Sequence, residues 1–96
     1  MLEKYERIKS LGSDLDFGFN WTRWLDEGES IVSYVFTNVD ENLVVSDDIL
    51  IGNYVIFFVS GGQADKWHEI TCRITTDALP KPRIDERTLR IYVTQR

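Results

Sequence analysis

Apolar and polar residues alternate along much of the chain, and this period of two is typical of β-strands that bury one face. The first clear case runs from residue 15 to residue 21, with apolar side chains at Leu15, Phe17, Phe19 and Trp21. Residues 30–39 are rich in β-branched and aromatic side chains, which pack well on a pleated sheet. We expect strands in both segments, a short strand at 43–46, a connection at 47–53, and a very apolar strand at 54–60.

The last two predicted strands define which side chains should face the core. Within residues 67–76 the inward set is His68, Ile70, Cys72 and Ile74, and within residues 86–95 it is Leu89, Ile91 and Val93. Because successive side chains point to opposite sides of a strand, Trp67, Arg90 and Tyr92 should face away from the core. Residues 77–85 contain two prolines, which cannot donate ladder hydrogen bonds, so this segment is predicted to be a loop.

Six or seven short strands without an interior helix predict an all-β fold, and an immunoglobulin-like β-sandwich over residues 15–96 is the best single interpretation. The paired cysteines of antibody domains are absent, because Cys72 is the only cysteine. Residues 1–14 form an N-terminal arm in this interpretation. Their apolar side chains lie three apart, at Leu2, Tyr5, Ile8 and Leu11. This spacing fits a short amphipathic helix or an extended arm. A strand exchanged with a neighbour and a disordered arm that orders on assembly also stay open.

Composition and charge narrow the function classes. The chain has 96 residues, enough for one core, and its 43% hydrophobic and 28% charged residues are ordinary for a globular domain. A net charge of −5 argues against nucleic-acid binding, which needs basic side chains to neutralise phosphates. The longest apolar run, residues 54–59, is too short to cross a membrane, and the charged N-terminus has no signal-peptide core. We therefore expect no membrane contact and synthesis in a cytoplasm.

Charge is unevenly distributed along the chain. Residues 14–48 contain nine acidic residues and one base, Arg23, whereas residues 66–96 contain seven bases and four acids. Identical subunits with this asymmetry could attract one another head to tail, which predicts a homo-oligomer whose assembly weakens with salt.

Four motifs occur in a fixed order: LDFGFNWTRWL at 15–25, SGG at 60–62, CRITT at 72–76 and PRIDERTLRIYV at 82–93. Together they resemble a family of small tailed-bacteriophage proteins described as fibre-tail adaptor proteins, whose members typically show L-D-Y-x-x-D-W-x-x-W-L, S-G-G, N-R-I-T-T and G-R-x-D-x-R-x-L-x-I-x-V. The resemblance covers residues 15–93 but not the arm. The chain departs from the family pattern at Asn20, His68, Cys72 and Pro82, where members usually have an acid, tyrosine, asparagine and glycine.

The resemblance implies a virion structural protein without enzymatic activity or cofactor, made in the host cytoplasm and placed in the tail. Its implied partners are tail, fibre or neck proteins of the same virion, which it would join. Other virion roles stay open, namely head-tail connector, stopper or capsid decoration, because fold alone does not determine function. An alternative of another class is a carbohydrate-binding module, in which Trp24 and Trp67 would stack on sugar rings.

Aromatic residues on the outward parity are the candidate contact residues. Trp67 should face away from the core. Phe58 and Tyr92 should also face outward and are possible neighbours of Trp67, and Arg90 lies beside Tyr92 in the closing strand. An apolar patch of this kind usually marks an interface, although both sides of the strand could instead be covered within the domain. Trp24 lies beyond its strand and is interpreted either as a lid on the sandwich or as a contact residue.

Other reactive side chains do not combine into a site. His68 and Cys72 are four residues apart on a strand, about 13 Å, which is too far for a nucleophile and its base. One histidine and one cysteine also fall short of the four ligands of a zinc site. The acidic clusters in the predicted turns lack the dense spacing of a calcium loop, so we interpret them as solvated turns. A charged group before the last strand predicts either salt bridges or a docking edge, at Arg83, Asp85, Glu86 and Arg87.

Overall fold

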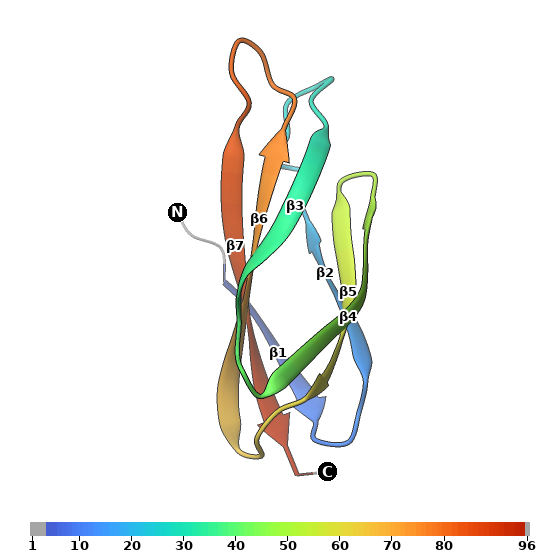
Figure 1. The fold of residues 1–96 in the computed structure, drawn as a ribbon, viewed down its shortest axis with the longest axis vertical. Helices are drawn as coiled ribbons and strands as arrows, with labels where there is room; N and C mark the ends of the chain where they lie inside the picture. The colour runs from blue at the N-terminus through green and yellow to red at the C-terminus, as the bar shows by residue number, and fades with distance from the viewer. Residues whose placement is uncertain (1–3, 96) are drawn as a thin grey trace.

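The computed structural model describes residues 4–95, which form seven β-strands in two facing sheets (Figure 1). The strands are β1 (Lys4–Ser10), β2 (Leu15–Asn20), β3 (Ile31–Val39), β4 (Leu43–Ile51), β5 (Tyr54–Gly61), β6 (Lys66–Thr76) and β7 (Ile84–Thr94). One sheet has the order β1-β7-β6-β3 and the other the order β2-β5-β4. The all-β prediction is confirmed, and two facing sheets agree with a β-sandwich. Within residues 4–95, no helix has the length and apolar character that crossing a membrane requires.

The two sheets share one apolar core, with Phe57 of β5 at its centre. The Phe57 ring lies 5.6 Å from the ring of Phe19 in the same sheet and 5.1 Å from the ring of Phe36 in the opposite sheet. The inward faces predicted for the last two strands are confirmed, because all of their members are buried: His68, Ile70, Cys72, Ile74, Leu89, Ile91 and Val93. Trp21, which continues the alternation of β2, is also fully buried.

Residues 4–10 form a strand and not a helix. β1 lies at the edge of the four-stranded sheet and pairs in parallel with β7, from Lys4 opposite Thr88 to Ser10 opposite Thr94. The helix alternative was therefore wrong for these residues. The parallel ladder with β7 satisfies the backbone hydrogen-bonding groups that a helix would have satisfied internally. Leu2, the first apolar position of the predicted pattern, lies outside the described residues.

A buried lysine ties β1 to the rest of the sandwich. The Lys9 side chain is 1% exposed. Its Nζ donates hydrogen bonds to the carbonyl oxygens of Ser10 at 2.8 Å, Gly61 at 3.0 Å and Leu11 at 3.4 Å. Burial lowers the pKa of the Lys9 ammonium, and the charge of Asp14 opposes this shift. Because Gly61 ends β5, the ammonium links the edge strand of one sheet to the central strand of the other.

The predicted connection at 47–53 was wrong, because β4 continues through it to Ile51. β4 contains a β-bulge at Asp47 and Asp48, and Asp47 adopts a positive φ of 51°. The bulge adds one residue to β4 between two consecutive pairs with β5, Ser46–Phe58 and Ile49–Ile56. An extra residue breaks the period of two. Alternation therefore no longer identified the segment as a strand.

Cys72 should be inert to thiol reagents in the folded protein. It is fully buried, and this burial raises the pKa of its thiol to about 12. Because the thiolate is the reactive form, we expect no labelling by dithionitrobenzoate at about pH 8 in native buffer and complete labelling in denaturant. The absorbance of the released thionitrobenzoate measures both. Rapid labelling of the native protein would contradict the position of Cys72 in a closed core.

Replacing Lys9 by methionine should destabilise the protein by about 2 kcal/mol, because the aliphatic stem remains while buried carbonyl oxygens lose their donor. The free energy of unfolding from urea titration measures the loss. Arg7→Met is the matched control, since Arg7 is a long, exposed cation on the same strand, and its change should stay within about 0.5 kcal/mol. Equal losses for the two variants would contradict a stabilising role for the Lys9 ammonium.

Candidate functional site

An apolar row crosses the outer face of the four-stranded sheet. The strand register sets Ile8 of β1 opposite Tyr92 of β7, and Tyr92 opposite Trp67 of β6. The ring centres of Trp67 and Tyr92 are 5.3 Å apart, in an edge-to-face arrangement. Ile8 is 67% exposed and Trp67 is 44% exposed. Because the solvated face of an antiparallel sheet is normally polar, this row is a candidate contact surface.

Arg90 is fixed against this row by carboxylates on both neighbouring strands. Its guanidinium carbon lies 4.3 Å from the centre of the Trp67 ring. Its Nη1 donates a hydrogen bond to Glu6 Oε2 at 2.8 Å, and its Nε lies 3.8 Å from Glu69 Oε2. Tryptophan, tyrosine and arginine are the residue types most enriched in binding hot spots. We use the name first face for Ile8, Trp67, Arg90 and Tyr92.

The first face contains three of the five predicted contact residues, Trp67, Arg90 and Tyr92. Phe58 does not lie beside Trp67, because β5 belongs to the three-stranded sheet, where it pairs with β2 and β4. The sequence analysis did not identify Ile8 as a contact residue. The spacing of three in the arm favoured a helix, whereas β1 is a strand whose alternation turns Ile8 outward. The contact role of these residues stays a prediction.

Trp24 belongs to the connection between β2 and β3. This connection lies at the opposite end of the molecule from the start of β6, the strand that begins next to Trp67 (Figure 1). Trp24 is half-buried and packs against the core. The guanidinium carbon of Arg83 lies 4.0 Å from the centre of its ring, and Arg83 Nη2 donates a hydrogen bond to the Trp24 carbonyl at 3.2 Å. This geometry supports the interpretation of Trp24 as a lid on the sandwich.

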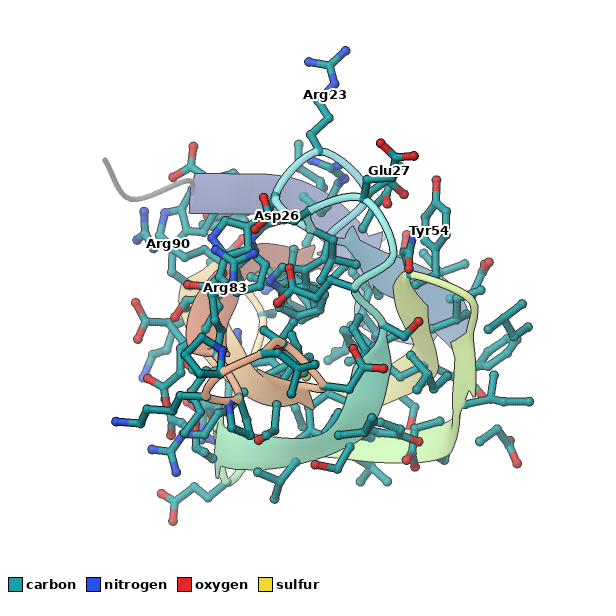
Figure 2. All side chains as sticks on the ribbon, turned by 90° about the horizontal axis from the view of Figure 1, so that it is seen from above. Arg23, Asp26, Glu27, Tyr54, Arg83 and Arg90 are labelled. Carbon is teal, nitrogen blue, oxygen red and sulfur yellow. The ribbon has the colours of Figure 1, made fainter. Side chains whose placement is uncertain are left out.

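Glu29 organises the same end of the sandwich. Its carboxylate accepts hydrogen bonds from Arg83 Nε at 2.9 Å, from Thr76 Oγ1 at 2.6 Å and from the Asp26 backbone N–H at 2.9 Å. Hydrogen bonds from Arg83 and then from Thr76 lower the pKa of Glu29 to about 2. Figure 2 looks onto this end and shows that Arg23, in the same connection, extends away from the body.

The two arginine–tryptophan contacts bear on the carbohydrate-binding alternative. Stacking on a sugar needs an open ring face. Arg83 lies over the ring of Trp24, and Arg90 lies over the ring of Trp67. The geometry therefore disfavours the two tryptophans as a sugar platform.

His68 and Cys72 are both buried in the core. His68 Nε2 accepts a hydrogen bond from the Gln63 backbone N–H at 2.9 Å, and its buried Nδ1 has no partner. Among the described residues, no group of three or more His, Cys, Asp or Glu side chains could hold a metal ion. These side chains have structural contacts and form no recognisable catalytic arrangement.

Four arginines of the late half are paired with carboxylates among the described residues. Their carboxylate partners are Glu86 for Arg73 at 2.9 Å, Glu29 for Arg83 at 2.5 Å, Asp85 for Arg87 at 3.5 Å, and Glu6 for Arg90 at 2.8 Å. The salt-bridge interpretation of the charged group at 83–87 is thereby supported. The attraction between an acidic early half and a basic late half stays a prediction, and these four guanidiniums already have carboxylates within the same subunit.

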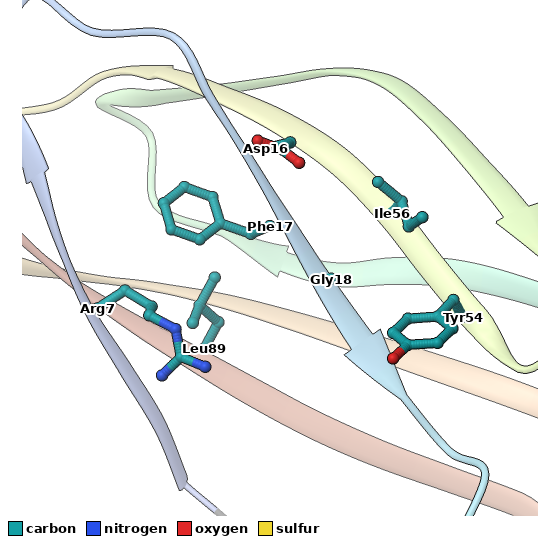
Figure 3. A pocket seen from close by; sticks show the side chains of 7 residues that line it. All are labelled: Arg7, Asp16, Phe17, Gly18, Tyr54, Ile56 and Leu89. Atoms are coloured by element: carbon teal, nitrogen blue, oxygen red, sulfur yellow. The ribbon is translucent and has the colours of Figure 1, made fainter.

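A groove of about 390 Å³ runs beside the free edge of β2 (Figure 3). Figure 3 shows Arg7 reaching toward it from β1, with Tyr54 and Ile56 on the side of β5. Its lining residues are Arg7, Asp16, Phe17, Gly18, Tyr54, Ile56 and Leu89. Gly18 has no side chain, which leaves the space between its neighbours open. The groove is lined by both apolar and polar groups, and its wall contains one cation, Arg7, and one carboxylate, Asp16.

Comparison with known proteins yields one family match. A family described as "Podophage GP4 fiber-tail adaptor protein gp77" matches residues 9–92 of the chain. No curated protein matches the chain. The matched region begins within β1 and ends within β7, so it spans both sheets.

Stability should fall in acid through Glu29. Its folded-state pKa of about 2 lies below its ordinary value of 4.5, so its contribution is fully present above about pH 4.5 and is lost as the pH falls toward 2. We expect Glu29→Gln to lower the melting temperature at neutral pH, and the difference from wild type to shrink steadily below about pH 4.5. Glu27→Gln, in the same connection but exposed, is the control. A difference for Glu29→Gln that does not change with pH would contradict this role.

Proposed function

Because the chain belongs to the podophage fibre-tail adaptor family, we propose that it joins the tail of its phage to fibre proteins or neighbouring tail proteins. Family membership makes it a tail-associated structural protein of the virion. A structural role agrees with the expectation that the chain is not an enzyme. The family description also favours an adaptor over the head-tail connector, stopper and capsid-decoration alternatives.

The observation that carries the proposal is the first face. Trp67 and Tyr92 form an edge-to-face aromatic pair, and Arg90 is held on Trp67 by Glu6 and Glu69. Aromatic side chains supply a large contact area and lose little conformational entropy on binding. Because Arg90 already has its carboxylates, the face needs no charged partner to neutralise it. A partner therefore contributes mainly apolar and hydrogen-bonding groups.

We also propose that the sandwich is immunoglobulin-like. The orders β2-β5-β4 and β7-β6-β3 support this, because they correspond to the B-E-D and G-F-C arrangements of immunoglobulin domains. β1 differs from the first strand of a constant-type domain in that it pairs with β7 and not with β2.

The proposed homo-oligomer rests on the adaptor role alone. Several copies around a tail would form a ring through repeated contacts between unlike surfaces. The pairing of Arg73, Arg83, Arg87 and Arg90 within one subunit means that such a ring depends on apolar contacts more than on charge.

Replacing Trp67 by alanine should weaken binding to one of the two partners by roughly 30-fold, about 2 kcal/mol, as loss of a central aromatic anchor does. Biolayer interferometry with the purified tail and fibre proteins of the same phage measures this. Leu79→Ala is the control, because Leu79 is 92% exposed in the β6–β7 loop at the other end of the molecule. A Trp67→Ala protein that folds and binds both partners like wild type would remove the first face from the proposal.

A further inference from the structure

The outer face of the three-stranded sheet is also apolar, on the opposite side of the sandwich from the first face. β5 turns its even-numbered side chains outward, and β4 adds residues from both sides of its bulge. We use the name second face for Val44, Ile49, Ile51, Tyr54, Ile56 and Phe58. All except the half-buried Ile56 are between 37% and 58% exposed. Figure 2 shows Tyr54 pointing away from the body of the molecule.

The bulge in β4 creates this surface. Strict alternation would place Val44 on one side of the strand and Ile49 and Ile51 on the other, because their positions differ in parity. The extra residue at Asp47–Asp48 shifts the alternation by one, so all three face outward while Val45 and Leu50 pack against the core. Bulges that re-aim side chains are common beside functional sites.

Uncompensated negative charge accompanies the second face. Asp16 lies in the same cross-strand row as Phe58, and the exposed Asp47 lies in the bulge. Within residues 4–95 neither of these two carboxylates is in an ion pair. Asp48, the other residue of the bulge, is turned toward the opposite sheet, where it accepts a hydrogen bond from the Tyr34 hydroxyl at 2.8 Å. This distinguishes the second face from the first, where Arg90 has its carboxylates in place.

The groove beside β2 adds a recess to the second face. Tyr54 and Ile56 belong to both, and Asp16 borders both. Pockets that enclose an apolar side chain and exclude water are favourable seats for interface hot spots. The surface therefore combines apolar area, the negative charge of Asp16 and Asp47, and a recess that Arg7 of β1 also lines.

A second copy of the chain does not fit this face. A two-fold contact would bring the same surface of each subunit together and set Asp16 and Asp47 of one copy against a surface with the same two carboxylates. Like charges set against one another across an interface are strongly unfavourable. The charge instead calls for lysine or arginine side chains in the partner.

We infer that the second face docks a different protein, whose contact surface combines apolar side chains with unpaired lysine or arginine. The inference rests on the proposed adaptor function and deepens it. The first face binds one of the tail and fibre proteins, and the second face binds the other. The two partners are then held on opposite sides of one rigid sandwich.

The test measures binding of the full chain to the purified tail and fibre proteins by biolayer interferometry over a range of salt concentrations. Ile49→Thr/Ile51→Thr removes apolar area and keeps β-branched residues in the strand. We expect roughly tenfold or greater loss of affinity for one partner and less than about twofold change for the other. Val35→Thr also puts threonine in place of a β-branched apolar residue, at a 52% exposed position on the other sheet. It should not weaken binding of the partner that the isoleucine variant loses.

Charge is tested by Asp16→Asn/Asp47→Asn, since asparagine tolerates the positive φ of residue 47. This variant should bind the same partner more weakly and with a shallower salt dependence. Glu27→Gln, which removes an exposed carboxylate at the other end of the molecule, is its control. Melting temperatures confirm that each variant folds.

Several results would overturn the inference. The isoleucine double variant could bind both partners like wild type, or the aspartate double variant could bind more tightly than wild type. Light scattering could also show a wild-type dimer that the isoleucine variant dissociates, which would make the occupant a second copy. Loss of binding only in Trp67→Ala would leave the adaptor proposal intact and reject the second face. Failure of the wild-type chain to bind either protein would reject both.

Discussion

Packing between Phe57 and Phe36 is the contact on which the rest of the structure depends. The two rings meet edge to face with centres 5.1 Å apart, and they belong to different sheets. Cys72 is the only cysteine, so no disulfide within the chain joins the sheets. Burial of apolar side chains between them supplies the main force that holds them together. Phe57 also contacts Phe17 and Phe19 of β2, so it connects an edge strand to the centre of the molecule.

The two outer faces follow from the same packing, because every strand has a side that the core does not use. Both outer faces carry exposed apolar residues, but they differ in charge. On the first face a guanidinium is held between two carboxylates, whereas the second face has aspartates without ion pairs among the described residues. Two surfaces of different character on opposite sides of a rigid body can distinguish two partners. This is the physical requirement for an adaptor.

Each of the three tryptophans has an arginine guanidinium over its ring. Arg83 lies 4.0 Å from Trp24, Arg87 lies 5.0 Å from Trp21, and Arg90 lies 4.3 Å from Trp67. Trp21 Nε1 also donates a hydrogen bond to Asp85 Oδ2 at 2.9 Å. The motif with two tryptophans at 15–25 and the charged motif at 82–93 are thus two halves of one contact. Their joint occurrence in the sequence reflects this contact, which closes one end of the sandwich.

The sequence by itself determined the all-β class, the inward faces of β6 and β7, and the outward direction of Trp67, Arg90 and Tyr92. These follow from alternation, which is a local property of each strand. The tertiary structure alone decided that Phe58 belongs to the other sheet, that residues 4–10 pair with β7, and which carboxylate each arginine meets. It also decided the bulge at Asp47, which assembles the second face. Such features depend on which strands come together and in what register, and hydrogen bonds between distant segments set that choice.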